Sequence, residues 1–178
     1  AKNKTIGIGS IALGYGNTAT GQGSLAVGTS NVVTGANAGA FGDPNYVGGT
    51  GSYAFGNDNI IGSTTNNAFV VGNNVKLGAT GVTVDNTTTP ATVTYDNETD
   101  VSGAVALGNN TGVTKAGGVA VGEGSQATIG SGIAGYDPKT GAASNLESGV
   151  WKSTNAAVSV GKADGSLTRQ ITGVAAGT

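Results

Sequence analysis

The chain has 178 residues, of which 34 are glycine, 10% are charged and 5% are aromatic. It has no cysteine and no histidine, which excludes disulfides, thiolate metal sites and the residue that most often serves as a general base. The net charge is −2 and the eight basic residues are scattered singly, so the chain offers no basic surface for nucleic acid. No apolar run approaches the roughly 20 residues of a membrane-spanning helix, and no signal-peptide pattern follows Ala1. We therefore expect an excised fragment whose only link to a membrane is a C-terminal anchor that lies outside it.

A five-residue motif recurs along most of the sequence. Its first and third residues are mostly small, its second and fourth are mostly larger and apolar, and its fifth is glycine. The glycines of the first four copies are 14 residues apart. This alternation is typical of a β-strand, because successive side chains of a strand point to opposite faces. The eight copies are residues 10–14, 24–28, 38–42, 52–56, 68–72, 104–108, 118–122 and 157–161.

A second pattern lies between these copies and keeps the same spacing. An asparagine is followed two residues later by an apolar residue, so each repeat predicts a second short strand. Asparagine and glycine suit the connecting turns because both tolerate positive φ. Coils stacked about 4.8 Å apart would make eight repeats a rod on the order of 40 Å long. The predicted fold class is all-β, a short-repeat β-solenoid with about 14 residues per coil. The in-phase pairs are Asn17 and Ala19, Asn31 and Val33, Asn45 and Val47, and Asn59 and Ile61.

The two faces of the first strand differ in the size of their side chains. One face carries larger apolar residues such as Ile11, Leu13 and Phe55, and we expect this face to fill the inside of each coil. The other face is too apolar for solvent and too small to form a core alone, so we expect it to pack against another subunit. The alanines of this predicted trimer interface are Ala12, Ala26, Ala40, Ala54, Ala106 and Ala120.

The repeat resembles that of the heads of YadA-like trimeric autotransporter adhesins, which reads approximately (Asn/Ser)-x-Ala-x-Gly. Residues 10–72 and 103–130 carry this resemblance. Residues 135–141 together with 151–154 look like the family's head insert motif. The resemblance implies a left-handed parallel β-roll, an intertwined homotrimer of three identical chains, and display on a Gram-negative outer membrane.

Residues 168–178 resemble the neck that joins such heads to a coiled-coil stalk, although necks often have Asn where this chain has Gly173. The resemblance places Arg169 and Gln170 in polar contacts between the three subunits at the neck.

Residues 79–102 fit neither the repeat nor the head insert motif. Residues 92–95 alternate like a strand, so we expect a β-excursion or an extended loop that leaves the solenoid. Insertions in repeat proteins map to loops on one face, often the binding face. The predicted segments are head repeats at 1–78, this insert at 79–102, head repeats at 103–134, the head insert motif at 135–156, a last repeat at 157–167 and the neck at 168–178.

Two motifs with known chemistry have simpler structural interpretations. Paired glycines such as Gly7 and Gly9 recur many times, whereas a dinucleotide fingerprint needs one such loop between a strand and a helix, so turn geometry is favoured. Clustered acidic residues of the insert either bind Ca²⁺ or form a solvated edge that discourages strand pairing, and we favour the edge. Few acids remain for a glycosidase pair, so we expect no catalytic, metal or cofactor site and no enzymatic activity. The acidic residues are Asp85, Asp96, Glu98 and Asp100.

Aromatic residues outside the repeat core are the candidates for ligand contact, because an exposed aromatic can anchor a partner. They are Tyr46, Tyr95, Tyr136 and Trp151. For Tyr136 and Trp151, packing of the insert against the trimer is the favoured alternative.

The leading functional hypothesis is adhesion, in which a trimeric rod presents three copies of one surface and gains avidity. The resemblance implies a host matrix protein (collagen, fibronectin or laminin) or a host cell-surface receptor as the ligand. The alternative is self-association or a passive role as spacer or shield. An ice-binding solenoid is disfavoured because no regular threonine ladder occurs, and a phage fibre because of the neck-like sequence.

Overall fold

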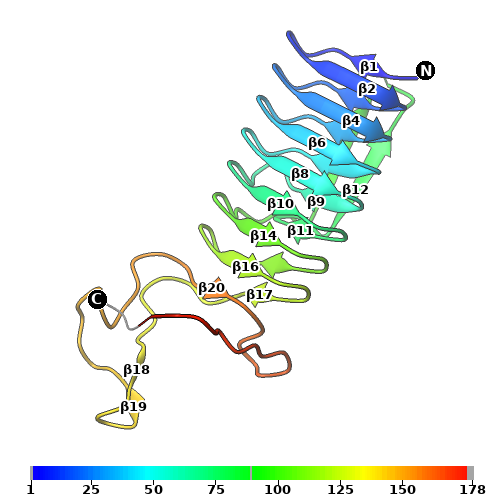
Figure 1. Cartoon of the computed structure of the whole chain (residues 1–178). Helices are drawn as coiled ribbons and strands as arrows, with labels where there is room; N and C mark the ends of the chain where they lie inside the picture. Colours follow the sequence, from blue (N-terminus) through cyan, green and yellow to red (C-terminus); the bar gives the residue numbers. More distant parts are fainter. Residues whose placement is uncertain (1, 89, 176–178) are drawn as a thin grey trace.

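The computed structural model describes residues 2–88 and 90–175, and over these residues the protein is an all-β solenoid without a helix (Figure 1). Each coil contributes one strand to each of two parallel sheets. The prediction of two short strands in each repeat is therefore confirmed. Within the described ranges no helix is long and apolar enough to cross a membrane.

Sheet A is built from the second strand of each repeat; Asn45 and Asn59 lie within strands of this sheet, and Asn17 and Asn31 lie just before strands of it. Its strands are short because a 14-residue coil leaves two or three residues for each of them. In order along the sheet they are β1 (Lys4–Thr5), β3 (Thr18–Ala19), β5 (Val32–Val33), β7 (Asn45–Val47), β9 (Asn59–Ile61), β11 (Lys76–Leu77), β15 (Gly112–Val113) and β17 (Gln126–Ala127).

Sheet B is built from the eight copies of the five-residue motif, all of which form strands. The copies stack in register, so that Ala26 lies beside Ala40 and Ala40 beside Ala54. The strands in order are β2 (Ile11–Tyr15), β4 (Leu25–Thr29), β6 (Gly39–Gly42), β8 (Tyr53–Gly56), β10 (Phe69–Val71), β14 (Val105–Leu107), β16 (Val119–Val121) and β20 (Val158–Ser159).

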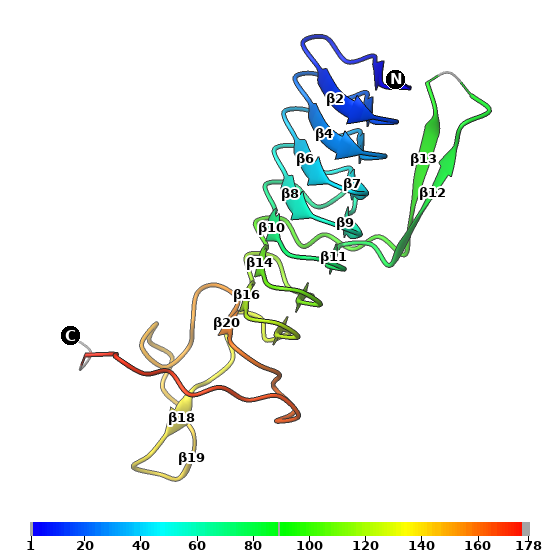
Figure 2. The same cartoon turned by 45° about the vertical axis from the view of Figure 1, so that its right-hand side comes forward.

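Two excursions interrupt the sequence of coils without interrupting their stacking. β10 pairs directly with β14, and β16 pairs directly with β20. The first excursion contains an antiparallel hairpin of β12 (Gly81–Asp85) and β13 (Thr92–Asp96), which runs back along the solenoid toward its N-terminal end (Figure 2). The second contains the short hairpin of β18 (Tyr136–Asp137) and β19 (Ala142–Ala143), which extends away from the last coils (Figure 1).

The core lies between the two sheets, and it reverses the predicted orientation of sheet B. The small side chains point inward and the larger ones outward: Ala54 is fully buried, whereas Leu13 is 64% exposed. The prediction that the larger face fills the coil is therefore wrong. The alanines predicted to contact another subunit lie inside their own chain instead. Ala26, Ala40, Ala54, Ala106 and Ala120 are fully buried there, and Ala12 is partly buried against the same cluster.

Sheet A supplies the larger side chains of this core. Val33, Val47, Ile61 and Leu77 are fully buried and face the alanines of sheet B. Protein interiors are close-packed, so a thin coil that takes branched side chains from one sheet has room only for small ones from the other.

Buried asparagines link successive coils. The side-chain amide of Asn45 donates hydrogen bonds to Asn31 Oδ1 (3.0 Å), to the Gly56 carbonyl (2.6 Å) and to the Phe41 carbonyl (3.3 Å). Its Oδ1 accepts from the side-chain amide of Asn59 (2.8 Å). Because every polar atom of Asn45 is used, the side chain is stable in a buried position. The same pattern repeats at Asn17 and Asn31.

We predict that Asn45→Ala lowers the free energy of unfolding by about 3 kcal/mol or more, because each buried partner left unsatisfied costs about 1–3 kcal/mol. The matched control is Asn57→Ala. Asn57 lies on the exposed corner of the next coil, where its Oδ1 accepts from the Asp43 amide (2.9 Å), so its loss should cost only about 1 kcal/mol. Urea unfolding followed by far-UV circular dichroism measures both. Equal effects of the two substitutions would contradict the structural role of the ladder.

Each strand of sheet B has a glycine at or close to its C-terminal end, because the chain turns there next to the following coil. Gly28, for example, has φ of 119°, and a Cβ at this position would collide with the carbonyl of Gly42. L-residues rarely adopt this backbone conformation. The repeated glycines of sheet B thus have a role in coil geometry, which explains their spacing without a bound phosphate.

Candidate interaction surfaces

The outward side of sheet B is a continuous strip of large apolar side chains that runs the length of the solenoid. Exposed fractions are 57% for Ile11, 40% for Phe69 and 68% for Val158. Contiguous apolar surface of this kind is rare on monomeric soluble proteins and marks an interaction site. We call it the apolar face, and it consists of Ile11, Leu13, Leu25, Val27, Phe41, Tyr53, Phe55, Phe69, Val71, Val105, Leu107, Val119, Val121 and Val158.

Stacked aromatic rings form the middle of the apolar face. The rings of Phe41 and Phe55 are parallel, with centroids 4.6 Å apart, and the ring of Phe69 is tilted against Phe55 at 5.7 Å. Their order follows from the in-register pairing of β6, β8 and β10. The coil backbone therefore fixes the positions of these side chains, and the apolar face is preformed for a partner.

The hairpin β12–β13 lies over the outward side of sheet A, opposite the apolar face (Figure 2). Tyr95 of β13 is the contact residue: a Cβ at Gly48 would lie 2.7 Å from its ring, and its hydroxyl is 3.5 Å from the Thr34 hydroxyl. Burial raises the pKa of Tyr95 to about 12. The structure thus uses Tyr95 for packing within the chain. Tyr46 of β7 is half-buried on the same outward side of sheet A.

Two carboxylates of the insert, those of Asp85 and Asp100, accept hydrogen bonds from its own loops. Asp85 accepts hydrogen bonds from the Thr87 hydroxyl and amide, and these bonds lower the pKa of Asp85. Ser102 lowers the pKa of Asp100 in the same way. No group of three potential metal-binding residues gathers anywhere in the part of the chain that the structure describes.

Tyr136 and Trp151 both lie in the second excursion, but in different surroundings. Tyr136 is 68% exposed on β18, whereas Trp151 is half-buried. The backbone carbonyl of Trp151 accepts from the Gly135 amide (2.7 Å), which joins the two parts of the excursion. Of the four aromatic candidates, Tyr136 presents the most surface to a ligand.

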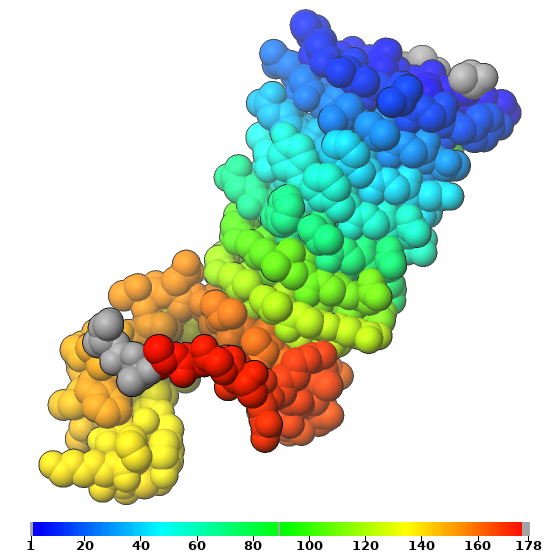
Figure 3. All heavy atoms as spheres, viewed as in Figure 1, coloured from blue at the N-terminus to red at the C-terminus, as the bar shows by residue number. Residues whose placement is uncertain are grey.

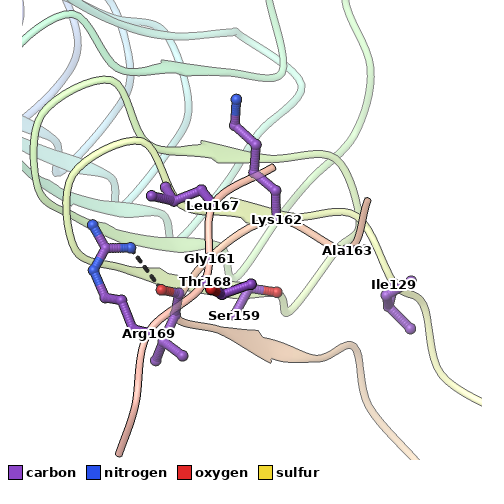
Figure 4. A pocket seen from close by; sticks show the side chains of 9 residues that line it. Ile129, Ser159, Gly161, Lys162, Ala163, Leu167, Thr168 and Arg169 are labelled. Carbon is purple, nitrogen blue, oxygen red and sulfur yellow. Dashed lines mark hydrogen bonds between the residues drawn. The ribbon is translucent and has the colours of Figure 1, made fainter. Parts of the chain in front are cut away.

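Arg169 closes the C-terminal end of the solenoid. Its guanidinium donates to the Glu123 carbonyl (2.6 Å), the Val160 carbonyl (2.6 Å) and the Ser125 hydroxyl (3.0 Å), and it borders an open hollow that Leu167 and Ile129 also line (Figure 4). These contacts lie within one chain. Gln170 is exposed beside it. Sequence reasoning gave Arg169 a role between subunits and missed this cap, because the cap depends on a return of the chain that no local motif encodes.

Comparisons with known proteins agree with this geometry. The family described as the YadA head domain repeat matches two overlapping stretches, residues 6–31 and 19–43, which contain β2 to β6. The chain is also 55% identical over 60 residues to the autotransporter adhesin BadA of Bartonella henselae. That match covers 34% of this chain and 2% of BadA. These matches support a YadA-like head of a trimeric autotransporter adhesin.

The same repeat architecture continues well beyond the stretch that the family comparison matches. β8, β10, β14, β16 and β20 extend sheet B in the register set by β2 to β6. The apolar face extends with them, from Ile11 to Val158. One kind of surface is therefore present along the whole solenoid.

Proposed function

We propose that this chain is the head of a trimeric surface adhesin in which three copies pack through their apolar faces. The observation that carries the proposal is the apolar face itself, which a single chain leaves in water. Burial of apolar surface stabilises association by about 25 cal/mol per Å² removed from water, before the costs of association are counted. Symmetric contact of one face with its own copies is the usual way in which homo-oligomers cover such surface.

The trimer would turn sheet A, the hairpin β12–β13 and the second excursion toward the outside. Three copies of each surface would then be displayed on the bacterial cell, where binding of several copies raises the overall affinity. We propose as ligand a host extracellular-matrix protein (collagen, fibronectin or laminin) or a host cell-surface receptor. The role is adhesive, with no catalytic step.

The left-handed winding, the head insert motif at 135–156 and the neck at 168–178 remain predictions from the family resemblance. Residues 176–178 of the neck lie outside the described residues. In the proposed trimer, the exposed Gln170 would contact a neighbouring subunit, while Arg169 would cap its own coil.

The test is binding of the light-scattering-verified trimer to an array of human matrix proteins and epithelial receptor ectodomains. The monomeric variant Phe55→Arg serves as the matched control. We expect saturable binding to a ligand that the trimer retains and the monomer loses. Silence across the array, or equal binding by monomer and trimer at equal chain concentration, would overturn multivalent adhesion and favour self-association or a spacer role.

A further inference from the structure

The outward side of sheet A changes character along the solenoid. In the coils of β5 to β9 its outward positions are apolar, with Val32, Tyr46 and Ile60 in register. In the later coils the same column continues with Lys76, Gly112 and Gln126. Val32 is 6% exposed and Ile60 is 7% exposed, although both point away from the coil interior. Another part of the chain must therefore cover them.

The hairpin β12–β13 is that cover. Its strands alternate, with half-buried side chains on one face and exposed threonines and aspartates on the other. The half-buried residues are Val82, Val84, Val93 and Tyr95. A two-stranded hairpin is at best marginally stable alone in water, so its docking on sheet A is what makes this excursion ordered.

Two groups of contacts hold the hairpin down. Tyr95 lies across Gly48 and reaches the Thr34 hydroxyl, and only a residue without a side chain admits the ring so close. At the base of the hairpin the Glu98 carboxylate accepts hydrogen bonds from the Ser63 amide and hydroxyl, the latter at 2.9 Å. No backbone hydrogen bond joins β12 or β13 to a strand of sheet A within the described residues. The two strands of the hairpin thus dock on sheet A through side-chain contacts, while a backbone hydrogen bond from the Thr99 amide to the Gly78 carbonyl (2.9 Å) holds the base of the excursion.

We propose that residues 79–102 form a strap that masks an apolar strip of sheet A, consisting of Val32, Tyr46 and Ile60. The strap gives the outside of the head a polar surface where the solenoid beneath it is apolar. Tyr95 and Glu98 are its two fastenings. This role is independent of which ligand the head binds.

The spacing of the coils suggests which residues to delete in order to remove the hairpin. The excursion places corresponding residues 36 positions apart instead of 14. Deleting residues 81–102 joins Thr80 to Gly103 and restores the ordinary spacing. The deletion also removes Val101, which is buried in the core between the sheets, so the fold of the excised variant is checked before its dye binding is compared.

The experiment compares binding of the dye anilinonaphthalene sulfonate to the parent trimer, the excised variant, and the excised variant that also carries Val32→Thr, Tyr46→Thr and Ile60→Thr. We expect several-fold stronger fluorescence for the excised variant and a return to the parent signal for the threonine variant. Light scattering and far-UV circular dichroism ensure that all three have the same assembly and strand content. Fluorescence that excision leaves unchanged would overturn the proposal.

A second measurement keeps the test decisive if the excised chain does not fold. In the full chain, Tyr95→Ala combined with Glu98→Gln should speed amide hydrogen exchange in residues 81–96 by at least an order of magnitude and leave exchange in β14 and β16 unchanged. The matched control is Thr83→Ala with Thr94→Ala on the exposed face of the hairpin. Equal exchange in the fastening variant and its control would show that the hairpin is ordered by something else.

Discussion

Ala54→Arg is expected to prevent the chain from folding. Ala54 is fully buried between the two sheets, where a guanidinium would find neither space nor a partner. An uncompensated buried charge costs about 3–5 kcal/mol, a large fraction of the stability of a domain of this size. Far-UV circular dichroism and urea unfolding should show a chain with little strand structure at any concentration.

The neighbouring residue provides the control for Ala54→Arg. Phe55 is next in sequence and in the same strand but points outward, so an arginine there adds the same charge on the other face. If the Ala54→Arg variant folded and lost only its trimeric assembly, the alanines would lie between subunits. That result would contradict the core described above.

Phe55→Arg should instead leave a folded monomer. The ring of Phe55 lies between those of Phe41 and Phe69 in the middle of the apolar face. In a trimer packed through this face, the arginine would lose its hydration without gaining an ion pair, which favours dissociation. Multi-angle light scattering should report one chain where the parent protein shows three, while circular dichroism stays unchanged.

The matched control for assembly is Thr94→Arg, which adds the same charge to the exposed face of the hairpin. This variant should remain trimeric. If Phe55→Arg is also trimeric, the three chains meet through another surface and the proposed packing is wrong.

The repeat spacing was sufficient to predict the solenoid. All eight copies of the five-residue motif became strands of sheet B, and the apolar residues that follow the in-phase asparagines became part of strands of sheet A. This success has a physical cause: strand alternation and turn-forming residues act locally, and a repeated unit makes the same local choices in each coil.

The direction of the faces was not predicted correctly, because it depends on both strands of a coil together. The first strand alone offers a large face and a small face, and the large face is the natural choice for a core. Val33, Val47 and Ile61 already fill the coil from the other sheet, so the interior accepts only alanine from sheet B. The signal was present in the sequence as a pairing of branched residues in one strand with small residues in the next.

Long-range contacts account for what else the sequence did not reveal. The hairpin packs on sheet A where Tyr95 lies against Gly48, and the C-terminal cap forms where Arg169 donates to the Glu123 carbonyl. No local sequence pattern predicts either of these two pairs. Tyr95 therefore seemed a free aromatic from the sequence, although it is packed against its own solenoid.

The coils on either side of each excursion pair as they would if the intervening residues were absent. The number of coils thus sets the length of the rod, whereas the excursions set what the rod carries on its outside; Figure 3 shows the second of them beyond the last coils. Because the two are separable, such a solenoid can exchange one surface for another through insertion or deletion while its length and its apolar face stay the same.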